Sequence, residues 1–458
     1  MDKVVASPEE ALADLCDGAS IAVAGFGTSF GFPGSLLVAA RDKGVKDLCL
    51  VSNGLGAIGQ LRSVVLVQSG QVSRLVVSFS SRPRLRTRAD DLIEAGKMQV
   101  ELVPQGTLVE RMRAGGAGIP AFYTPTGVGT PIAEGKEVRY FDGKPYILEH
   151  ALHVDYAFLR GERADRLGNV EFRGTNINFN PSFAKAARIA IVEVNEIVDV
   201  GQIPPERVGL PGAFVTRVVK TTVEPDTIRP ASRRPADQPR VYNGKPAWTR
   251  NEMARRTAGV LPEPGYVNLG TGMPTLVSNY IADRDIILQG ENGILGYGEL
   301  VEGNDVDRNV FNAGGQFVAL RPGASFFDSV TAFEMARSGR LDAVVLGAYQ
   351  VDEEGNLANY STTISIQGGI GGAMDLVAGK KTLIVMMEHR DSQDRPKLVR
   401  RASMPLTGRT CVDIIVTDLA ILRRVDGVFV LEEVAEGFRP AEVLALTDMD
   451  VRLSPALG

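Results

Sequence analysis

The stretch DYAFLRGERADRLGNV, at residues 155–170, returns with the same spacing as DAVVLGAYQVDEEGNL at residues 342–357. Asp155 and Asp342 are 187 residues apart (342 − 155), and the same offset holds for the later Asp, Gly and Asn of both copies. Each copy begins as an apolar run typical of a strand and ends in a polar turn with a Gly-Asn step. The repetition of a whole strand-and-turn unit predicts a duplicated domain.

A second pair of similar segments lies upstream of the two copies. Residues 21–38 and 267–278 each contain an apolar strand, a glycine turn and a proline that begins an expected helix. Between the two sets, residues 221–250 carry five prolines, which break helices and sheet ladders. We predict an N-terminal domain at 1–220, a linker at 221–250 and a C-terminal domain at 251–458. The alternative for the proline-rich segment is a long surface loop inside one domain.

Short β-branched runs alternate with helical stretches along both halves, which is typical of βαβ units. We therefore predict two homologous open α/β domains with mainly parallel sheets. The glycine-rich run at 104–127 is too irregular for a plain helix or strand, so we expect it to be a loop. Buried strands are predicted at 48–52, 75–78, 189–194, 286–288, 343–346 and 383–387, and helices at 35–43 and 330–338.

Composition excludes several classes of protein. The chain has 50 Lys and Arg against 55 Asp and Glu, a net charge of −5, whereas nucleic-acid binders usually carry a basic excess. The three cysteines, Cys16, Cys49 and Cys411, are far apart, which suits a reducing compartment and offers no zinc set. The N-terminus resembles no signal peptide, and no apolar run approaches 18 residues. We expect a cytoplasmic protein that binds neither membrane nor nucleic acid.

Motifs for common cofactors are imperfect in this chain. The glycines of Gly25-x-Gly27-x-x-x-Gly31 follow a predicted strand, but their spacing differs by one residue from a dinucleotide fingerprint. The segment 379–382 lacks the leading glycine and the Ser or Thr of a phosphate-binding loop. With only three histidines, a His-dependent triad or metal site is poorly supplied. We expect no metal and no bound cofactor.

Glu291 is the strongest candidate for a reacting group. It lies in the glycine-rich segment 289–298, directly after the predicted strand 286–288. Open α/β sheets place their ligands at the carboxyl ends of strands, and glycine permits a substrate to approach closely. A second glycine run, residues 368–372, could present consecutive backbone amides to an oxyanion. Each segment taken alone also fits an ordinary turn.

At these motifs the chain resembles the class I coenzyme A transferases, most closely the fused succinyl-CoA:3-oxoacid CoA-transferases, in which a linker joins two homologous halves. The resemblance runs from about residue 17 to residue 417 and is strongest at 104–130, 288–296, 322–327, 368–377 and 404–411. It implies a catalytic Glu291 and an oxyanion hole formed by the amides of Gly372 and Ala373. Further residues that it implies near CoA or the acid substrate are Asn53, Asn268, Asn359, Gly27 and Gly31.

Several positions depart from the family pattern, mostly on the side that would recognise the acid. Gly290 replaces a serine before the glutamate, Gly54 replaces the second of two asparagines, and Gly315 stands where the family has a lysine of the CoA site. A Gly-Glu-Asn segment is replaced by residues 81–84. The neighbouring arginines 82, 84, 86 and 88 could bind a dicarboxylate or form a solvated face. These departures leave the identity of the acceptor acid open.

The resemblance implies a ping-pong transfer of CoA from an acyl-CoA, by family default succinyl-CoA, to a carboxylic acid such as acetoacetate, through a glutamyl-CoA thioester. CoA and acyl-CoA would then be substrates, and the family suggests a homodimer. Two alternatives stay open: an acyl-CoA or C–C hydrolase on the same scaffold, in which water replaces the acid, and a non-catalytic acyl-CoA or sugar-phosphate binding protein. The non-catalytic alternative gives no reason to bury the Glu291 carboxylate beside an anionic ligand, because burial of a charged group is costly.

Overall fold

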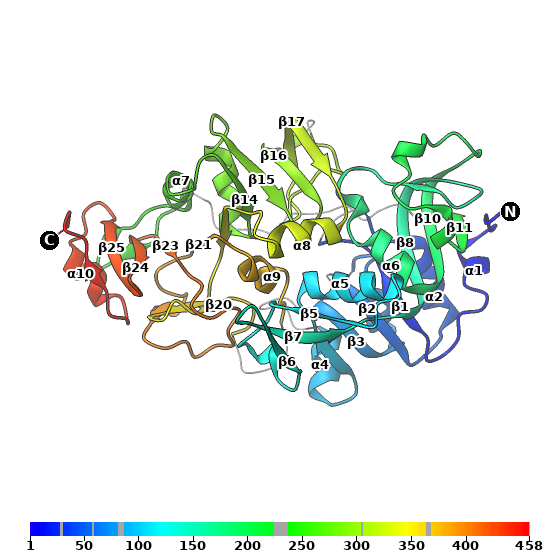
Figure 1. The fold of residues 1–458 in the computed structure, drawn as a ribbon, viewed down its shortest axis with the longest axis horizontal. Helices are drawn as coiled ribbons and strands as arrows, with labels where there is room; N and C mark the ends of the chain where they lie inside the picture. The colour runs from blue at the N-terminus through cyan, green and yellow to red at the C-terminus, as the bar shows by residue number, and fades with distance from the viewer. Residues whose placement is uncertain are drawn as a thin grey trace.

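The computed structural model describes residues 1–27, 31–56, 59–80, 87–223, 237–303, 306–362 and 368–457. Residues 1–223 form the first half of the molecule and residues 237–457 the second half. Each half is built on its own large sheet, and the N- and C-termini lie at opposite ends of an elongated molecule (Figure 1). Of the predicted linker, residues 224–236 lie outside the described residues.

The sheet of the first half has, among the described residues, eight strands in the order β11-β10-β8-β1-β2-β3-β4, with β9 antiparallel to β8. All other neighbours in it are parallel. Its strands are β1 (Ser20–Val23), β2 (Leu48–Gly54), β3 (Val72–Phe79), β4 (Gln99–Leu102), β8 (Val154–Asp165), β9 (Val170–Glu171), β10 (Ala187–Val198) and β11 (Arg217–Lys220). Its helices are α1 (Pro8–Ala11), α2 (Gly34–Lys43), α3 (Val64–Gln68), α4 (Arg88–Glu94), α5 (Gln105–Gly116) and α6 (Asn180–Ala186).

The sheet of the second half repeats this order and then extends it. Strands β15-β14-β18-β21-β23 are parallel neighbours, as β2-β1-β8-β10-β11 are in the first half, and antiparallel strands continue at both edges. Its strands are β14 (Gly265–Leu269), β15 (Ile286–Gly290), β16 (Ile294–Leu300), β17 (Val318–Phe326), β18 (Ala343–Leu346), β21 (Thr382–Met386), β23 (Ile414–Val416), β24 (Ala420–Val425), β25 (Val428–Val434) and β26 (Arg452–Leu453). Its helices are α7 (Arg250–Gly259), α8 (Ser329–Arg337), α9 (Ala373–Ala378) and α10 (Pro440–Ala445). The prediction of an α/β fold with mainly parallel sheets is confirmed.

Smaller sheets flank these two. Strands β5 (Ala121–Thr124), β7 (Lys144–His150) and β6 (Val138–Phe141) form one, and β20 (Leu357–Ala358), β19 (Gln350–Asp352) and β22 (Leu398–Val399) form another. A short hairpin joins β12 (Val241–Tyr242) to β13 (Lys245–Pro246).

The repeated sequence stretch has the same local structure in both halves. The carboxylate of Asp165 accepts hydrogen bonds from the backbone N–H of Asn169 at 3.0 Å and from its side-chain amide at 2.8 Å. Asp352 accepts the same two bonds from Asn356, both at 3.0 Å. The glycine before each asparagine has a positive φ, which favours glycine. The spacing is thus repeated because each copy closes the same side-chain-stabilised turn.

Two predicted elements differ in the structure. The run expected to be a loop contains the helix α5. Its glycines serve close packing, because a Cβ at Gly115 would lie 2.4 Å from the Leu152 carbonyl oxygen and one at Gly116 would lie 2.5 Å from the Lys185 side chain. The helix expected after Pro274 is a 3₁₀ helix, Met273–Tyr280.

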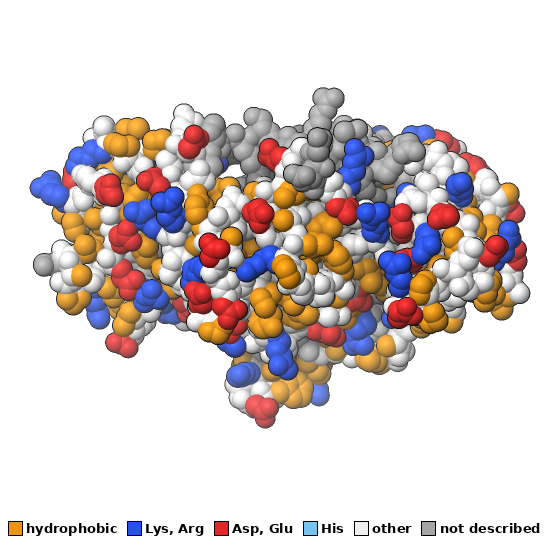
Figure 2. Space-filling view, turned by 90° about the horizontal axis from the view of Figure 1, so that it is seen from above, with side chains coloured by type: hydrophobic (Ala, Val, Ile, Leu, Met, Phe, Trp, Pro, Cys, Tyr) orange, Lys and Arg blue, Asp and Glu red, His pale blue; other side chains and the backbone are white. Residues whose placement is uncertain are grey.

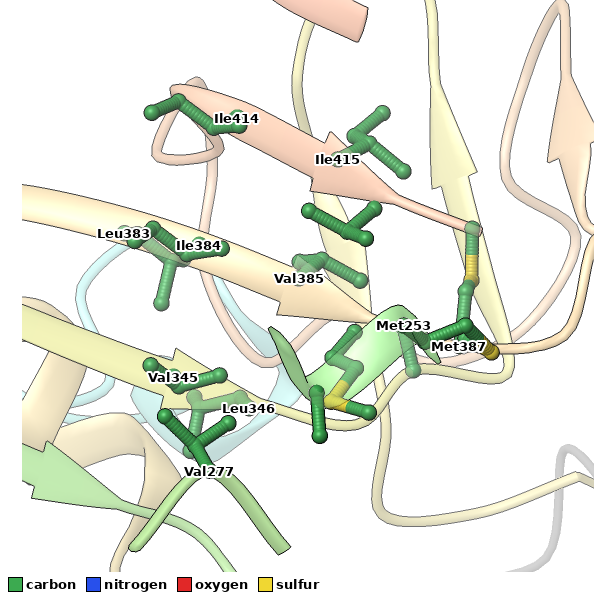
Figure 3. Packing of buried hydrophobic residues seen from close by; sticks show 14 of the residues in the cluster. Met253, Val277, Val345, Leu346, Leu383, Ile384, Val385, Met387, Ile414 and Ile415 are labelled. Carbon is green, nitrogen blue, oxygen red and sulfur yellow. The ribbon is translucent and has the colours of Figure 1, made fainter. Parts of the chain in front are cut away.

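Buried apolar side chains form a core in each half. Figure 3 shows part of the second core, where parallel strands β18, β21 and β23 present branched side chains to Met253 of α7. Residues of the second half also complete clusters centred on the first: Val330 and Phe333 of α8 join one, and Tyr360, Ile370 and Met374 join another. The two halves therefore share apolar cores. On the face seen in Figure 2, acidic and basic side chains are interspersed, in keeping with the small net charge.

Candidate active site

Glu291 directly follows β15, at the carboxyl end of a buried parallel strand pair. Strand β15 runs parallel to β14, and their register places Asn268 opposite Gln289. Glu291 is 5% exposed, and Asn268 is fully buried. The side-chain amide of Asn268 donates a hydrogen bond of 3.0 Å to Oε2 of Glu291. The structure thus brings together two of the residues that the sequence singled out.

Burial and hydrogen bonding act on Glu291 in opposite directions. Removal from water raises the pKa of the Glu291 carboxyl, because the charged form loses hydration. The bond from Asn268 lowers that pKa, because it stabilises the carboxylate. The net result is a raised pKa, and perturbed pKa values of buried carboxyl groups are common at functional sites.

Gln289 is a further hydrogen-bond partner of the Asn268 side-chain amide. The Asn268 Nδ2 atom donates to Oε1 of Gln289 at 2.7 Å and to its carbonyl oxygen at 3.1 Å. Gln289 Nε2 in turn donates to the carbonyl oxygen of Ala332 in α8 at 3.2 Å. Because the carbonyl oxygens and the carboxylate can only accept, both amides are fixed with their NH₂ groups as donors. Sequence reasoning missed Gln289, although it belongs to the quoted segment.

The turn after Glu291 depends on glycine. Gly293 has a φ of +102°, and a Cβ there would lie 2.0 Å from the carbonyl oxygen of Phe327. At position 290, where the family pattern has serine, a Cβ would lie 2.6 Å from Oδ1 of Asn292. The glycine at 290 therefore fits the observed placement of Asn292, whose Nδ2 donates to the Phe311 carbonyl at 2.7 Å.

The glycine run at 368–372 is held by main-chain atoms of the first half. Ser80 N–H donates to the Gly368 carbonyl at 3.1 Å, Gln105 N–H donates to the Gly371 carbonyl at 2.9 Å, and Gly371 N–H donates to the Ser78 carbonyl at 3.3 Å. The ring of Phe79 lies against Gly369 and Gly371, where any Cβ would come within 3 Å of it. Gly372, the last residue of the run, is the N-cap of α9, which begins at Ala373.

Helix α8 connects the Glu291 strand with this glycine run. Its Ala332 accepts the Gln289 bond, and its Phe333 ring lies 2.9 Å from where a Cβ of Gly372 would stand. Figure 1 shows α5, α8 and α9 gathered in the middle of the molecule, where they contact one another. Gln289, two residues before Glu291, and Gly372 thus contact consecutive residues of one helix.

Asn53 joins this region from the first half. It lies near the end of β2 and accepts a 2.6 Å hydrogen bond from Nε2 of Gln105, whose backbone N–H binds Gly371. Gln105 is a second residue that sequence reasoning missed as a site residue. The sequence feature that could have pointed to Gln105 is the Pro-Gln-Gly step at residues 104–106, which begins the segment expected to be a loop. Beside Asn53, a Cβ at Gly54 would lie 3.1 Å from Cβ of Phe79, so the glycine makes room for that ring.

The structure shows contacts of two of the other predicted site residues, Asn359 and Gly31. Asn359 follows β20, donates to the Gly347 carbonyl at 3.2 Å and accepts a bond from Thr407 at 2.7 Å. Gly27 and Gly31 flank residues 28–30, which lie outside the described part of the chain. A Cβ at Gly31 would lie 2.7 Å from Oδ1 of Asn176.

The arginines at 82, 84 and 86 lie outside the described residues, as does the whole 81–84 replacement. Arg88 begins α4, where its guanidinium donates to the carbonyl oxygen of Gln68. In the described part of the chain, no group of three or more His, Cys, Asp or Glu side chains could hold a metal ion. None of the helices in those ranges has the length and apolar character needed to cross a membrane.

Comparison with known proteins agrees with the family resemblance found in the sequence. The family model described as Coenzyme A transferase matches residues 5–221 and 250–445. This chain belongs to the coenzyme A transferase family. Its enzyme class is therefore CoA-transferase, as the sequence predicted.

Members of this family from mammals are similar along almost the whole chain. The mouse protein named succinyl-CoA:3-ketoacid coenzyme A transferase 2A, mitochondrial, is 41% identical over 98% of this chain and 89% of its own length. The human protein of the corresponding name is 39% identical over 99% and 91%. Their names place them in mitochondria, so they give no support to the predicted cytoplasmic location.

Two further proteins show how the halves and the fold compare. One of the subunits named succinyl-CoA:3-ketoacid coenzyme A transferase in Helicobacter pylori is 44% identical to 48% of this chain, over 93% of its own length. The crystal structure of an acyl-CoA transferase from Escherichia coli O157:H7 superposes with a TM-score of 0.80, covering 100% of this chain and 95% of that one. At 22% identity, that structure supports the fold alone.

Proposed function

We propose that this enzyme transfers CoA from succinyl-CoA to a 3-oxoacid such as acetoacetate, by a ping-pong mechanism with a glutamyl-CoA thioester on Glu291. The observation that carries this proposal is the placement of Glu291: a buried carboxylate at the end of a parallel strand, hydrogen-bonded by a buried amide. The names of the mammalian relatives support the choice of donor and acceptor.

The first half-reaction has two steps. A Glu291 carboxylate oxygen attacks the thioester carbonyl carbon of the donor to form a tetrahedral adduct. The C–S bond of this adduct then breaks, so CoA leaves as a thiolate and a mixed anhydride of Glu291 and the donor acid remains. The thiolate then attacks the Glu291 carbonyl carbon of that anhydride, which forms the glutamyl-CoA thioester and releases the donor acid. The acceptor carboxylate reverses both steps, so Glu291 is regenerated and the new acyl-CoA leaves.

The chain's own groups would assist at defined points. The backbone N–H groups of Gly372 and Ala373 would stabilise each tetrahedral oxyanion, and such a donor is worth about 3–4 kcal/mol in well-studied enzymes. Asn268 would keep Glu291 ionised for attack, because its bond favours the carboxylate. The low exposure of Glu291 would limit hydrolysis of the anhydride and thioester by water.

Glu291→Gln tests the nucleophile. The variant should fold but should not exchange CoA between succinyl-CoA and acetoacetate, and in the wild type acyl-CoA followed by borohydride should modify Glu291. Transferase activity in the variant, or modification of another carboxylate, would contradict the proposal.

An acceptor panel tests the substrate class. Production of acetoacetyl-CoA from succinyl-CoA is expected, with parallel lines in double-reciprocal plots because the kinetics are ping-pong. CoA release at the same rate without any acid would show a hydrolase instead. The proposal includes a homodimer, which light scattering on the purified enzyme would test.

A further inference from the structure

Asp375 links the two halves just after the proposed oxyanion hole. It is fully buried in α9, two residues after Ala373. Its Oδ2 accepts a 2.8 Å hydrogen bond from the backbone N–H of Gly106, and its Oδ1 accepts a 3.1 Å bond from the hydroxyl of Thr126. Both donors belong to the first half, so the carboxylate spans the junction.

The bond from Gly106 is a helix cap supplied by the other half. Helix α5 has 12 residues, and its own N-cap residue, Pro104, provides no side-chain acceptor. The first N–H groups of a helix have no partner within the helix, and a carboxylate there is favoured by hydrogen bonding and by the helix dipole. Asp375 fulfils this role from α9.

The space beside Asp375 at the junction of the halves admits only glycine at position 106. A Cβ at Gly106 would lie 2.4 Å from Oδ1 of Asp375 and 2.7 Å from an Arg337 nitrogen, so only glycine fits. Arg337 of α8 completes the charge balance, with one guanidinium nitrogen 3.6 Å from Asp375 and another 3.3 Å from Glu110 of α5. The buried carboxylate is therefore paired as well as hydrogen-bonded.

The capped end of α5 also positions the glycine run. Gln105, next to Gly106, donates its backbone N–H to the Gly371 carbonyl one residue before Gly372. The segment from Gly371 to Asp375 is thus fixed at both ends to the first turn of α5. The amides of Gly372 and Ala373 lie between these two attachment points.

We propose that Asp375 is a positioning residue that fixes the Gly372 and Ala373 amides by capping α5 across the junction of the halves. This inference rests on the proposed function, because it assigns those amides to the oxyanion. Asp375 itself touches no reacting atom. Its loss should slow the chemical step while leaving Glu291 and the CoA site in place.

The test is a single-turnover reaction of the full-length enzyme with succinyl-CoA and no acceptor, in which both the rate and the amount of glutamyl-CoA thioester are measured. Asp375→Ala removes the cap and should slow thioester formation about 10- to 100-fold, with the amount formed per enzyme unchanged. Asp375→Asn keeps an acceptor for the Gly106 N–H and should recover most of the rate. Gly106→Ala disturbs the contact between Gly106 and Asp375 from the first half and should slow thioester formation as Asp375→Ala does.

Arg173→Gln is the matched control, because it breaks an exposed ion pair between the halves, 3.2 Å from Arg173 to Asp307, without involving α5 or α9. It should form thioester at the wild-type rate. A wild-type rate in Asp375→Ala, a smaller amount at an unchanged rate, or no recovery in Asp375→Asn would overturn the inference. Failure of the proposed function is a separate result: it would appear as transferase activity in Glu291→Gln.

Discussion

Replacing Asn268 by leucine should move the acidic limb of the pH–rate profile to higher pH. The substitution removes the 3.0 Å bond from Asn268 Nδ2 to the Glu291 carboxylate while keeping a side chain of similar size at a fully buried position. Burial then raises the pKa of Glu291 against a backbone hydrogen bond alone, so a larger share of the enzyme holds a protonated, non-nucleophilic carboxyl at a given pH.

The size of the effect follows from the bond. A hydrogen bond to a charged group contributes about 1.5–3 kcal/mol, and each pH unit corresponds to about 1.4 kcal/mol, so the limb should move by about one to two pH units. The assay is kcat/KM for succinyl-CoA, measured from acid to alkaline pH with saturating acetoacetate. At neutral pH the variant should be slow, and raising the pH should restore much of its rate.

A matched variant separates this effect from general disturbance of the site. Gln289→Met removes the side-chain bonds of residue 289 to Asn268 and Ala332 but keeps the Asn268 bond to Glu291, so its acidic limb should stay in place. An unmoved limb in Asn268→Leu, or an equal displacement in both variants, would refute the reasoning that the Asn268 bond maintains the ionised nucleophile.

Three other predictions concern stability. Glu291→Gln should raise the free energy of unfolding at neutral pH by about 1 kcal/mol, because a carboxyl whose folded pKa is raised destabilises the fold once pH exceeds its unfolded pKa; the gain should vanish in acid, as chemical denaturation would show. Gly293→Ala should destabilise the fold by about 3 kcal/mol or more and abolish activity, given the positive φ and the clash with Phe327; a soluble variant with a wild-type melting temperature would contradict this. Burial lowers the pKa of His389 to about 3, so stability should fall by up to about 1.4 kcal/mol per pH unit as pH drops below 6.5, and His389→Leu should flatten that slope in urea titrations.

The position of Glu291, the proposed nucleophile, could be predicted because it follows a recognisable strand, whereas Asn268 was singled out only by the family resemblance. Glu291 follows a short apolar run among glycines, and Asn268 is the next-to-last residue of the preceding strand of the same sheet. Parallel neighbours bring such ends to one edge, and that rule needs only local sequence pattern. The repeated Asp-Gly-Asn turns were predictable for the same reason, since each closes within five residues.

The contacts between the halves could not be predicted in this way. The bond from Gly106 to Asp375 joins residues 269 positions apart, and neither residue type signals a partner at that distance. Helix α5 was expected to be a loop because three of its residues are glycines, which have low helix propensity. Tertiary packing overrides this propensity, because those glycines allow the backbone of α5 to approach its neighbours.

The shared cores have a consequence for how the enzyme behaves on dilution. Because Tyr360, Ile370 and Met374 complete a cluster of the first half, and main-chain bonds from Ser80 and Gln105 hold the glycine run, the site requires both halves in contact. In a single polypeptide this encounter is intramolecular, so its effective concentration does not fall on dilution. Specific activity per chain should therefore not depend on the association of separate halves.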